Sequence, residues 1–128
     1  MSRRIRCSVV AIALAASAVA VSVPTAQAYT SSITDFNMSG SWTAYGTYTV
    51  TADTGGTVSY RWVDSTGLQN EVKIETCGGS FLGSQVFNAG VTAWRVLATG
   101  VGNGTCIRLL GRTTGGGIMN GYDGELSR

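Results

Sequence analysis

The stretch WTAYGTYTVT at residues 42–51 alternates in hydrophobicity and decides the fold class. One set of alternate positions holds Trp42, Ala44, Gly46, Tyr48 and Val50, and the other holds Thr43, Tyr45, Thr47, Thr49 and Thr51. A period of two residues predicts a half-buried β-strand whose more apolar face meets the core. We therefore expect Trp42 and Tyr48 in the core. Tyr45 is then the aromatic residue expected on the exposed, Thr-rich face.

The same alternation recurs along the chain, and at 57–63 it places Tyr60 and Trp62 on an apolar face that we expect in the core. It predicts strands at 57–63, 68–76, 91–99 and 106–112, with weaker ones around 85–87 and 118–126. Turn signals at 53–56 and 64–67 separate the first three strands. Segment 91–99 is apolar on both faces, which favours the middle of a sheet. We predict an all-β protein, a small antiparallel β-sandwich or barrel of five to seven strands.

Residues 1–28 are typical of a secretory signal peptide. Three arginines precede an uncharged run rich in Ala and Val, and the triplet at 26–28 is an A-x-A cleavage signal. The run is shorter than the roughly 20 residues that a membrane span needs. We expect a secreted, extracellular protein without a membrane anchor after cleavage. Its organisation would be a signal peptide (1–28), an N-terminal arm (29–39) and a single β domain (40–128).

Two of the three cysteines, Cys77 and Cys106, lie beyond the predicted cleavage site. An even number of cysteines in a small exported domain predicts a disulfide. This bond would tie the end of strand 68–76 to the start of strand 106–112. Closing a loop of this length is expected to stabilise the fold by about 3–4 kcal/mol.

The composition argues against most catalytic chemistry. The chain has no His, which excludes Ser-His and Cys-His nucleophile systems and any His-ligated metal. Lys73 lies between Glu71 and Glu75 in an alternating strand, where neighbouring carboxylates keep an amine charged and unable to act as a base. Three of the nine basic residues belong to the signal peptide, so no basic footprint for nucleic acid remains.

The acidic residues do not form a recognisable site either. Glu71 and Glu75 lie about 13 Å apart along an extended strand, too far for a glycosidase pair. Asp53 and Asp64 lie in turn motifs that explain them without calcium, and Asp123 has no calcium-loop spacing around it. We expect no enzyme activity, no cofactor, no metal and no nucleic-acid partner.

The segment 29–39 is rich in Ser and Thr and lacks Gly and Pro. It is either a frayed terminus or edge strand of its own sheet, or a strand donated to a partner. For a donated strand, the apolar anchors would be Ile33 with either Tyr29 or Phe36. Ser31 would share a face with Tyr29 and Ile33. Including the exposed Tyr45, the predicted partner-binding residues are Tyr29, Ser31, Ile33, Phe36 and Tyr45.

The stretches TAWRVLATG at 92–100 and CIRLLGR at 106–112, with the arm and the two cysteines, carry a family resemblance. The chain resembles the small adaptor subunit of the Streptomyces umbrella toxin particles. This implies a secreted, non-catalytic subunit that bridges a large repeat-containing toxin scaffold to trypsin-fold, lectin-like subunits. Such assemblies inhibit competing bacteria, and the N-terminal extension engages the trypsin-fold partner.

Two other functions remain open from the sequence. A carbohydrate- or cell-wall-binding module would use Tyr45 to stack on a sugar ring. A small protease inhibitor would need a rigid protruding loop, whereas the loops at 78–79 and 100–104 are rich in glycine.

The cleavage site and the disulfide can be tested together. We expect the exported protein to begin at Tyr29 and to be lighter than its reduced form by the two hydrogens of one disulfide. Intact-mass spectrometry under non-reducing and reducing conditions measures both. Two free thiols on the exported protein would contradict the disulfide, and an N-terminus upstream of Tyr29 would contradict the cleavage site.

Overall fold

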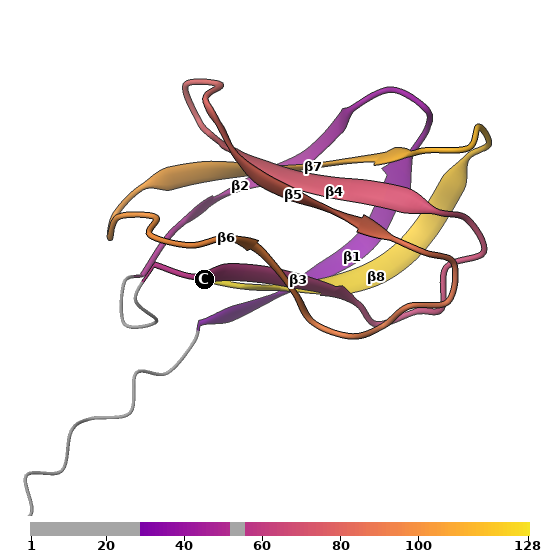
Figure 1. Cartoon of the computed structure of the whole chain (residues 1–128), viewed down its shortest axis with the longest axis horizontal. Helices are drawn as coiled ribbons and strands as arrows, with labels where there is room; N and C mark the ends of the chain where they lie inside the picture. Colours follow the sequence, from indigo (N-terminus) through magenta and orange to yellow (C-terminus); the bar gives the residue numbers. More distant parts are fainter. Residues whose placement is uncertain (1–28, 52–55) are drawn as a thin grey trace, which may run out of the picture.

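A computed structural model describes residues 29–51 and 56–128, which form two stacked antiparallel sheets (Figure 1). Sheet A has the order β1-β8-β3-β6 and sheet B has the order β2-β7-β4-β5. The strands are β1 (Thr30–Met38), β2 (Thr43–Thr49), β3 (Val58–Trp62), β4 (Asn70–Thr76), β5 (Phe81–Phe87), β6 (Arg95–Ala98), β7 (Cys106–Thr113) and β8 (Met119–Ser127).

This architecture confirms the all-β prediction and is a sandwich. The eighth strand, one more than the largest number predicted, is β1, which comes from the segment expected to be an arm. Within the two described ranges, no helix is long and apolar enough to cross a membrane. The predicted signal peptide and the turn residues 53–55 lie outside the described residues.

The core between the sheets is built around Trp62, which is fully buried. Its ring meets Tyr60 edge to face at 5.1 Å and lies 5.9 Å from Phe36. The indole Nε1 donates a 2.9 Å hydrogen bond to Oδ1 of Asn70, a buried residue of sheet B. This bond satisfies the polar atom of a large apolar side chain and links the two sheets. The predicted core positions of Tyr60 and Trp62 are confirmed.

The segment 29–39 is not a separate arm, because β1 belongs to the protein's own sheet. It pairs with β8 from Thr30 opposite Ser127 to Met38 opposite Met119. Ile33 and Phe36 are 0% and 1% exposed and lie in the core. Of the two roles left open by the sequence, the structure has the edge strand, and it corrects the expected boundary between arm and domain.

A β-bulge at Tyr45 changes the facing of β2. Ala44 and Gly46, on either side of it, pair with the adjacent residues Leu110 and Leu109 of β7. Tyr45 is therefore an extra residue that has no partner in the ladder. The alternation shifts by one position there, so side chains that share a face in the sequence pattern lie on opposite faces before and after the bulge.

The bulge corrects two predictions from the sequence pattern. Trp42 lies on the outer side of sheet B rather than in the core, whereas Tyr48 packs against the core as predicted. Tyr45 does not project from an exposed face. Its ring packs 5.0 Å from Phe36, and its hydroxyl accepts from the N–H of Thr34 and donates to the Thr34 carbonyl, both at 2.9 Å. Tyr45 thus fastens β1 to β2.

At the edge of the sandwich away from β1 and β2, the strands β5 and β6 approach each other closely and close the sandwich. A Cβ atom on Gly83 would lie 1.8 Å from the carbonyl oxygen of Leu97, so this position requires glycine. The side-chain amide of Gln85 donates a 3.0 Å hydrogen bond to the carbonyl of Val96. These contacts protect two strand edges that would otherwise be open to pairing.

Segment 91–99 is not a central strand. Only Arg95–Ala98 is extended, and this β6 is the edge strand of sheet A next to β3. Trp94 and Val96 are 42% and 46% exposed, whereas Leu97 is buried. One of the two apolar faces of this segment is turned to solvent. The prediction of a strand buried on both faces was therefore wrong.

The predicted disulfide between Cys77 and Cys106 is confirmed. The two Cα atoms lie 5.4 Å apart, and the N–H of Cys77 donates a 2.9 Å hydrogen bond to the carbonyl of Cys106. Cys77 directly follows β4 and Cys106 opens β7, so the bond fixes the end of the central strand pair of sheet B.

The role of β1 can be tested by shortening its side chains. Phe36→Ala is expected to lower the free energy of unfolding by about 3–5 kcal/mol, because it removes a buried ring. Ser32→Ala, at an exposed position of the same strand, should have little effect. A chain that begins at Gly40 should not fold, since sheet A then loses one of the two partners of β8 together with the buried side chains of Ile33 and Phe36. Urea unfolding followed by circular dichroism measures all three. Cooperative unfolding of the shortened chain at the wild-type midpoint would contradict the assignment.

Candidate functional site

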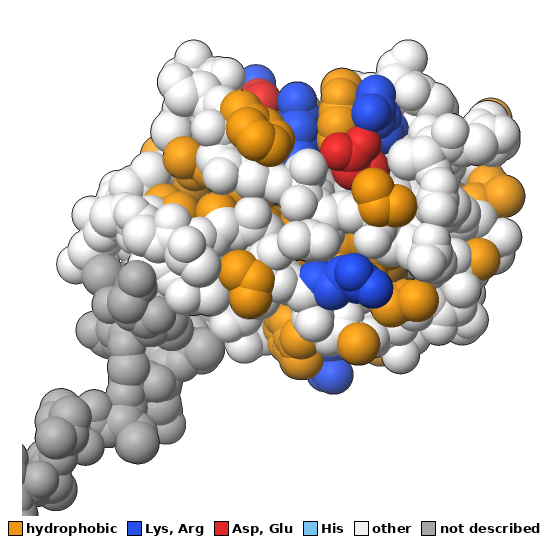
Figure 2. Space-filling model, in the orientation of Figure 1, with side chains coloured by type: hydrophobic (Ala, Val, Ile, Leu, Met, Phe, Trp, Pro, Cys, Tyr) orange, Lys and Arg blue, Asp and Glu red, His pale blue; other side chains and the backbone are white. Residues whose placement is uncertain are grey.

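The outer face of sheet B carries a dense set of charged side chains. Glu71, Lys73 and Glu75 of β4 point to this side, and Arg108 and Arg112 of β7 lie beside them. Figure 2 shows charged and hydrophobic side chains interleaved over this layer. We call this surface the sheet B face. It includes Leu110 between the two arginines, Trp42 from the loop before β2, and Phe81 and Val86 from β5.

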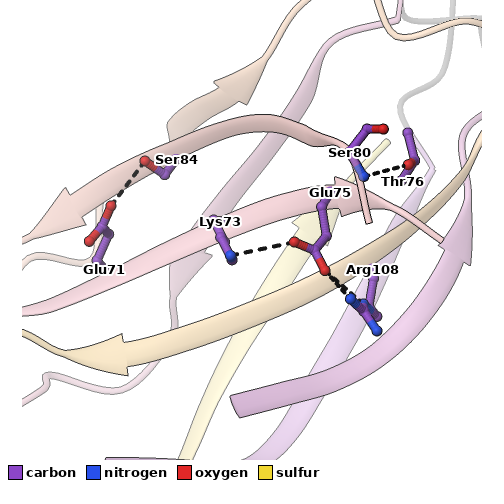
Figure 3. A network of polar contacts seen from close by, with 7 residues as sticks. All are labelled: Glu71, Lys73, Glu75, Thr76, Ser80, Ser84 and Arg108. Atoms are coloured by element: carbon purple, nitrogen blue, oxygen red, sulfur yellow. Dashed lines mark hydrogen bonds and ion pairs between the residues drawn. The ribbon is translucent and has the colours of Figure 1, made fainter. Parts of the chain in front are cut away.

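Each carboxylate of the sheet B face is held by several donors, and Figure 3 shows those of Glu75 together with the bond from Ser84 to Glu71. Glu75 accepts from Nε and Nη2 of Arg108, and its other oxygen lies 3.4 Å from the Lys73 ammonium. Glu71 accepts from Nε and Nη2 of Arg112 at 3.1 and 2.8 Å. The hydroxyl of Ser84 adds a 3.1 Å hydrogen bond to Glu71. Such pairing holds the guanidinium groups in defined orientations.

The electrostatics of Glu75 follow from this pairing. The hydrogen bonds from Arg108 are the largest cause that lowers the pKa of Glu75 below its usual 4.5, and Lys73 lowers it further. Desolvation acts in the opposite direction and is outweighed. Glu75 is therefore an ionised structural partner, and it lacks the raised pKa of a general acid.

Trp42 lies against two cations of the sheet B face. The Lys73 ammonium is 4.4 Å and the Arg112 guanidinium carbon 4.5 Å from the centre of its ring. These distances are typical of cation–π contacts. The indole thus covers part of the charged row and is itself fixed in place.

The outer face of sheet A carries a second aromatic and arginine group. Arg61 on β3 pairs with Glu125 on β8 at 2.6 Å, and its guanidinium carbon lies 4.9 Å from the centre of the Trp94 ring. Val63 and Val96 are about half exposed. We call these five residues the sheet A face. It lies on the side of the sandwich opposite the sheet B face (Figure 1).

The predicted partner-binding residues do not form one surface. Ile33 and Phe36 are core residues, Tyr45 is bound to β1, and Ser31 is partly buried opposite Leu126. Tyr29 alone is well exposed, and the Arg128 guanidinium lies 4.8 Å from its ring centre. The residues that sequence reasoning missed, Trp42 and Trp94, were assigned to buried faces by alternation.

Three aspartates lie near one another, and the carboxylates of two of them accept hydrogen bonds from backbone N–H groups. Oδ1 of Asp123 accepts from the N–H of Asp35 at 3.0 Å, and Oδ2 of Asp64 accepts from the N–H of Asp123 at 2.8 Å. Asp35 has a φ of 52°, a left-handed conformation that aspartate tolerates well. Among residues 29–51 and 56–128 no group of three His, Cys, Asp or Glu side chains could hold a metal ion.

An open hollow of about 230 Å³ lies where β1, β2 and β8 meet. Its lining includes Asn37, Thr43, Ile118 and Asn120, and none of the lining residues is titratable. Asn37 already accepts a 2.7 Å hydrogen bond from the N–H of Gly121. Such a hollow offers amide, hydroxyl and apolar contacts but no group for acid–base chemistry.

Comparison of the chain with protein-family models, with curated proteins and with solved structures finds no match.

The ion pairs of Glu75 predict a pH dependence of stability. A depressed native pKa stabilises the fold above the pKa of the unfolded state, and this contribution is lost as pH falls through the native value. Glu75→Gln should lower the unfolding temperature at pH 7 and flatten its decline below about pH 4.5. Arg108→Gln should flatten it as well, because it removes the donor that lowers the pKa. Calorimetry from neutral to acid pH measures both, and an unchanged acid decline in Glu75→Gln would contradict this role.

Proposed function

We propose that this protein is a secreted, non-catalytic adaptor that bridges two other proteins of an extracellular assembly. The observation that carries the proposal is an aromatic and arginine group on each of the two opposite outer faces. Trp94 is exposed on the sheet A face, and on the sheet B face Phe81 is exposed while Trp42 is half-buried. Trp and Arg are the residue types most enriched among those that dominate binding energy at protein interfaces. A β-sandwich with one binding face would need such a group on one side only.

The position of the two faces favours simultaneous binding. Stacked sheets lie about 10 Å apart, so partners on the two outer sides do not compete for space. Each group has a polar surround, Glu125 beside Arg61 on sheet A and Glu71 beside Arg112 on sheet B. Apolar contacts with a hydrogen-bonding surround are the usual composition of a protein interface.

The chemistry of the chain supports a role without catalysis. No His is present, and the single lysine beyond residue 28, Lys73, lies against Glu75 and the Trp42 ring. The carboxylates of the sheet B face are bonded to arginines and do not flank an open cleft. These groups hold a surface in shape and leave no nucleophile paired with a base.

The resemblance to the umbrella toxin adaptor names candidate partners, a large repeat-containing scaffold and trypsin-fold, lectin-like subunits. The adaptor of that family engages its trypsin-fold partner through the N-terminal extension. In this chain the matching segment forms β1, so we assign partner binding mainly to the outer faces. The exposed Tyr29, directly before β1, remains a candidate contact.

A second candidate function is carbohydrate binding at the sheet A face. Trp94 is 42% exposed and lies next to the hydrogen-bonding pair of Arg61 and Glu125. An exposed indole beside polar groups is the arrangement that a sugar ring requires. This function would need only one face and no second protein.

The adaptor is tested by purifying a tagged chain from culture supernatant of the producing bacterium. We expect a stable complex that contains two other proteins at defined stoichiometry, measured by size-exclusion chromatography with light scattering. Trp94→Ala should release one of the two and retain the other, because truncating an aromatic hot spot costs about 2 kcal/mol or more. Recovery of a monomer that binds polysaccharide would support the second function instead, and a complex with a single partner would contradict bridging.

A further inference from the structure

We infer that the sheet B face docks an acidic protein surface whose carboxylates meet Arg108 and Arg112 and whose apolar side chains rest on Phe81 and Val86. The inference deepens the proposed function, on which it rests, by giving the chemistry of one partner. It follows from how the charges on this face are exposed.

The sheet B face presents its cations outward and shields its anions. The side chains of Arg108 and Arg112 are 39% and 40% exposed, whereas those of Glu75 and Glu71 are 9% and 17% exposed. Lys73 adds a third cation to two carboxylates. An approaching molecule therefore meets a positive surface, even though every arginine on it already has a carboxylate partner.

Both arginines keep hydrogen-bonding capacity for a partner. Arg108 and Arg112 use Nε and Nη2 to hold Glu75 and Glu71. The guanidinium group has five N–H donors, so the end formed by Nη1 and Nη2 can still receive a carboxylate. Because the glutamates already fix the other side of each guanidinium group, little side-chain entropy of the arginines is lost on binding.

The spacing of Arg108 and Arg112 determines the separation that two carboxylates of a partner must have. They lie four residues apart on the same side of β7, about 13 Å along the strand. Leu110 lies between them and is 7% exposed, since the surrounding side chains cover it. Two carboxylates at this separation would each find a guanidinium group. Trp42, lying over Arg112 and Lys73, borders the same row.

The apolar part of the contact lies on β5. Phe81 stands opposite Glu75 and Val86 opposite Glu71, on the same side of the sheet as the charged row. They are 64% and 43% exposed. Because β4 separates β5 from β7, the apolar and cationic rows run side by side about 10 Å apart. A folded protein surface can present acidic and apolar side chains in parallel rows.

This pairing favours a protein over an anionic polysaccharide. A uronic-acid chain would supply carboxylates for the arginines but no apolar side chains for Phe81 and Val86. In addition, Trp42 already has two cations against its ring, which limits the ring surface open to a sugar. Binding of a protein should therefore depend on Phe81 and Val86 of β5, whereas binding of an anionic polysaccharide should not.

Three defined polymers test the inference without a natural partner. They are a random copolymer of Glu and Tyr, poly-L-glutamate and polygalacturonate. By fluorescence anisotropy, we expect the copolymer to bind at least fivefold more tightly than either of the others. Phe81→Ser with Val86→Ser should abolish this preference and leave the weaker binding of poly-L-glutamate unchanged.

A matched pair of arginine variants provides the control. Arg112→Gln and Arg61→Gln each remove one guanidinium group of nearly equal side-chain exposure, 40% and 38%, from one ion pair with a glutamate. Arg112→Gln should weaken copolymer binding at least tenfold, and Arg61→Gln should change it less than twofold. Equal losses in both variants, or equal binding of polygalacturonate and the copolymer, would overturn the inference. Unfolding temperatures of both variants identify any loss that comes from unfolding.

The outcome is separable from that of the proposed function. Selective copolymer binding with no protein partners in the culture supernatant would leave the inference standing and remove the adaptor role. A stable two-partner complex with no copolymer preference would do the reverse, and would direct attention to other surfaces.

Discussion

The hydrogen bond from Trp62 to Asn70 is the interaction on which the rest of the sandwich depends. It joins β3 of sheet A to β4 of sheet B through two side chains that are fully buried. A buried indole N–H or amide without a partner would cost more than the bond itself contributes. Both groups are satisfied in this relative placement of the two sheets, and the aromatic rings around Trp62 pack in the same placement. The positions of the two outer faces follow from this placement of the sheets.

The sequence pattern predicted the fold where strands are regular and failed where they are not. Tyr60 and Trp62 alternate without interruption in β3, so their burial could be inferred from spacing alone. In β2 the bulge at Tyr45 shifts the alternation by one residue, and the only signal for it in the sequence is the adjacent Gly46, a residue type that often marks a bulge inside a strand. This is why Trp42 was placed in the core and Tyr45 on the surface, the reverse of what the structure shows.

The candidate site was the least predictable part for a related reason. Outer-face groups arise from residues on different strands, and their contacts depend on strand order, which alternation does not specify. Trp94 meets Arg61 because β6 lies beside β3, and Arg112 meets Glu71 because β7 lies beside β4. The disulfide, in contrast, was predictable because an even number of cysteines beyond a predicted signal peptide suffices for it.

The pairing of β1 with β8 has a consequence for the order in which the molecule assembles. Thr30 lies opposite Ser127, so the first strand of the sheet has no partner until the last strand has been synthesised. Contacts between such distant residues slow folding, because a long loop must close before they contribute. During that interval Ile33 and Phe36 remain uncovered on a strand with open edges. The partly folded chain must avoid association with other chains during this interval. The Ser and Thr residues of β1 make one side of the unpaired strand polar, which disfavours such association.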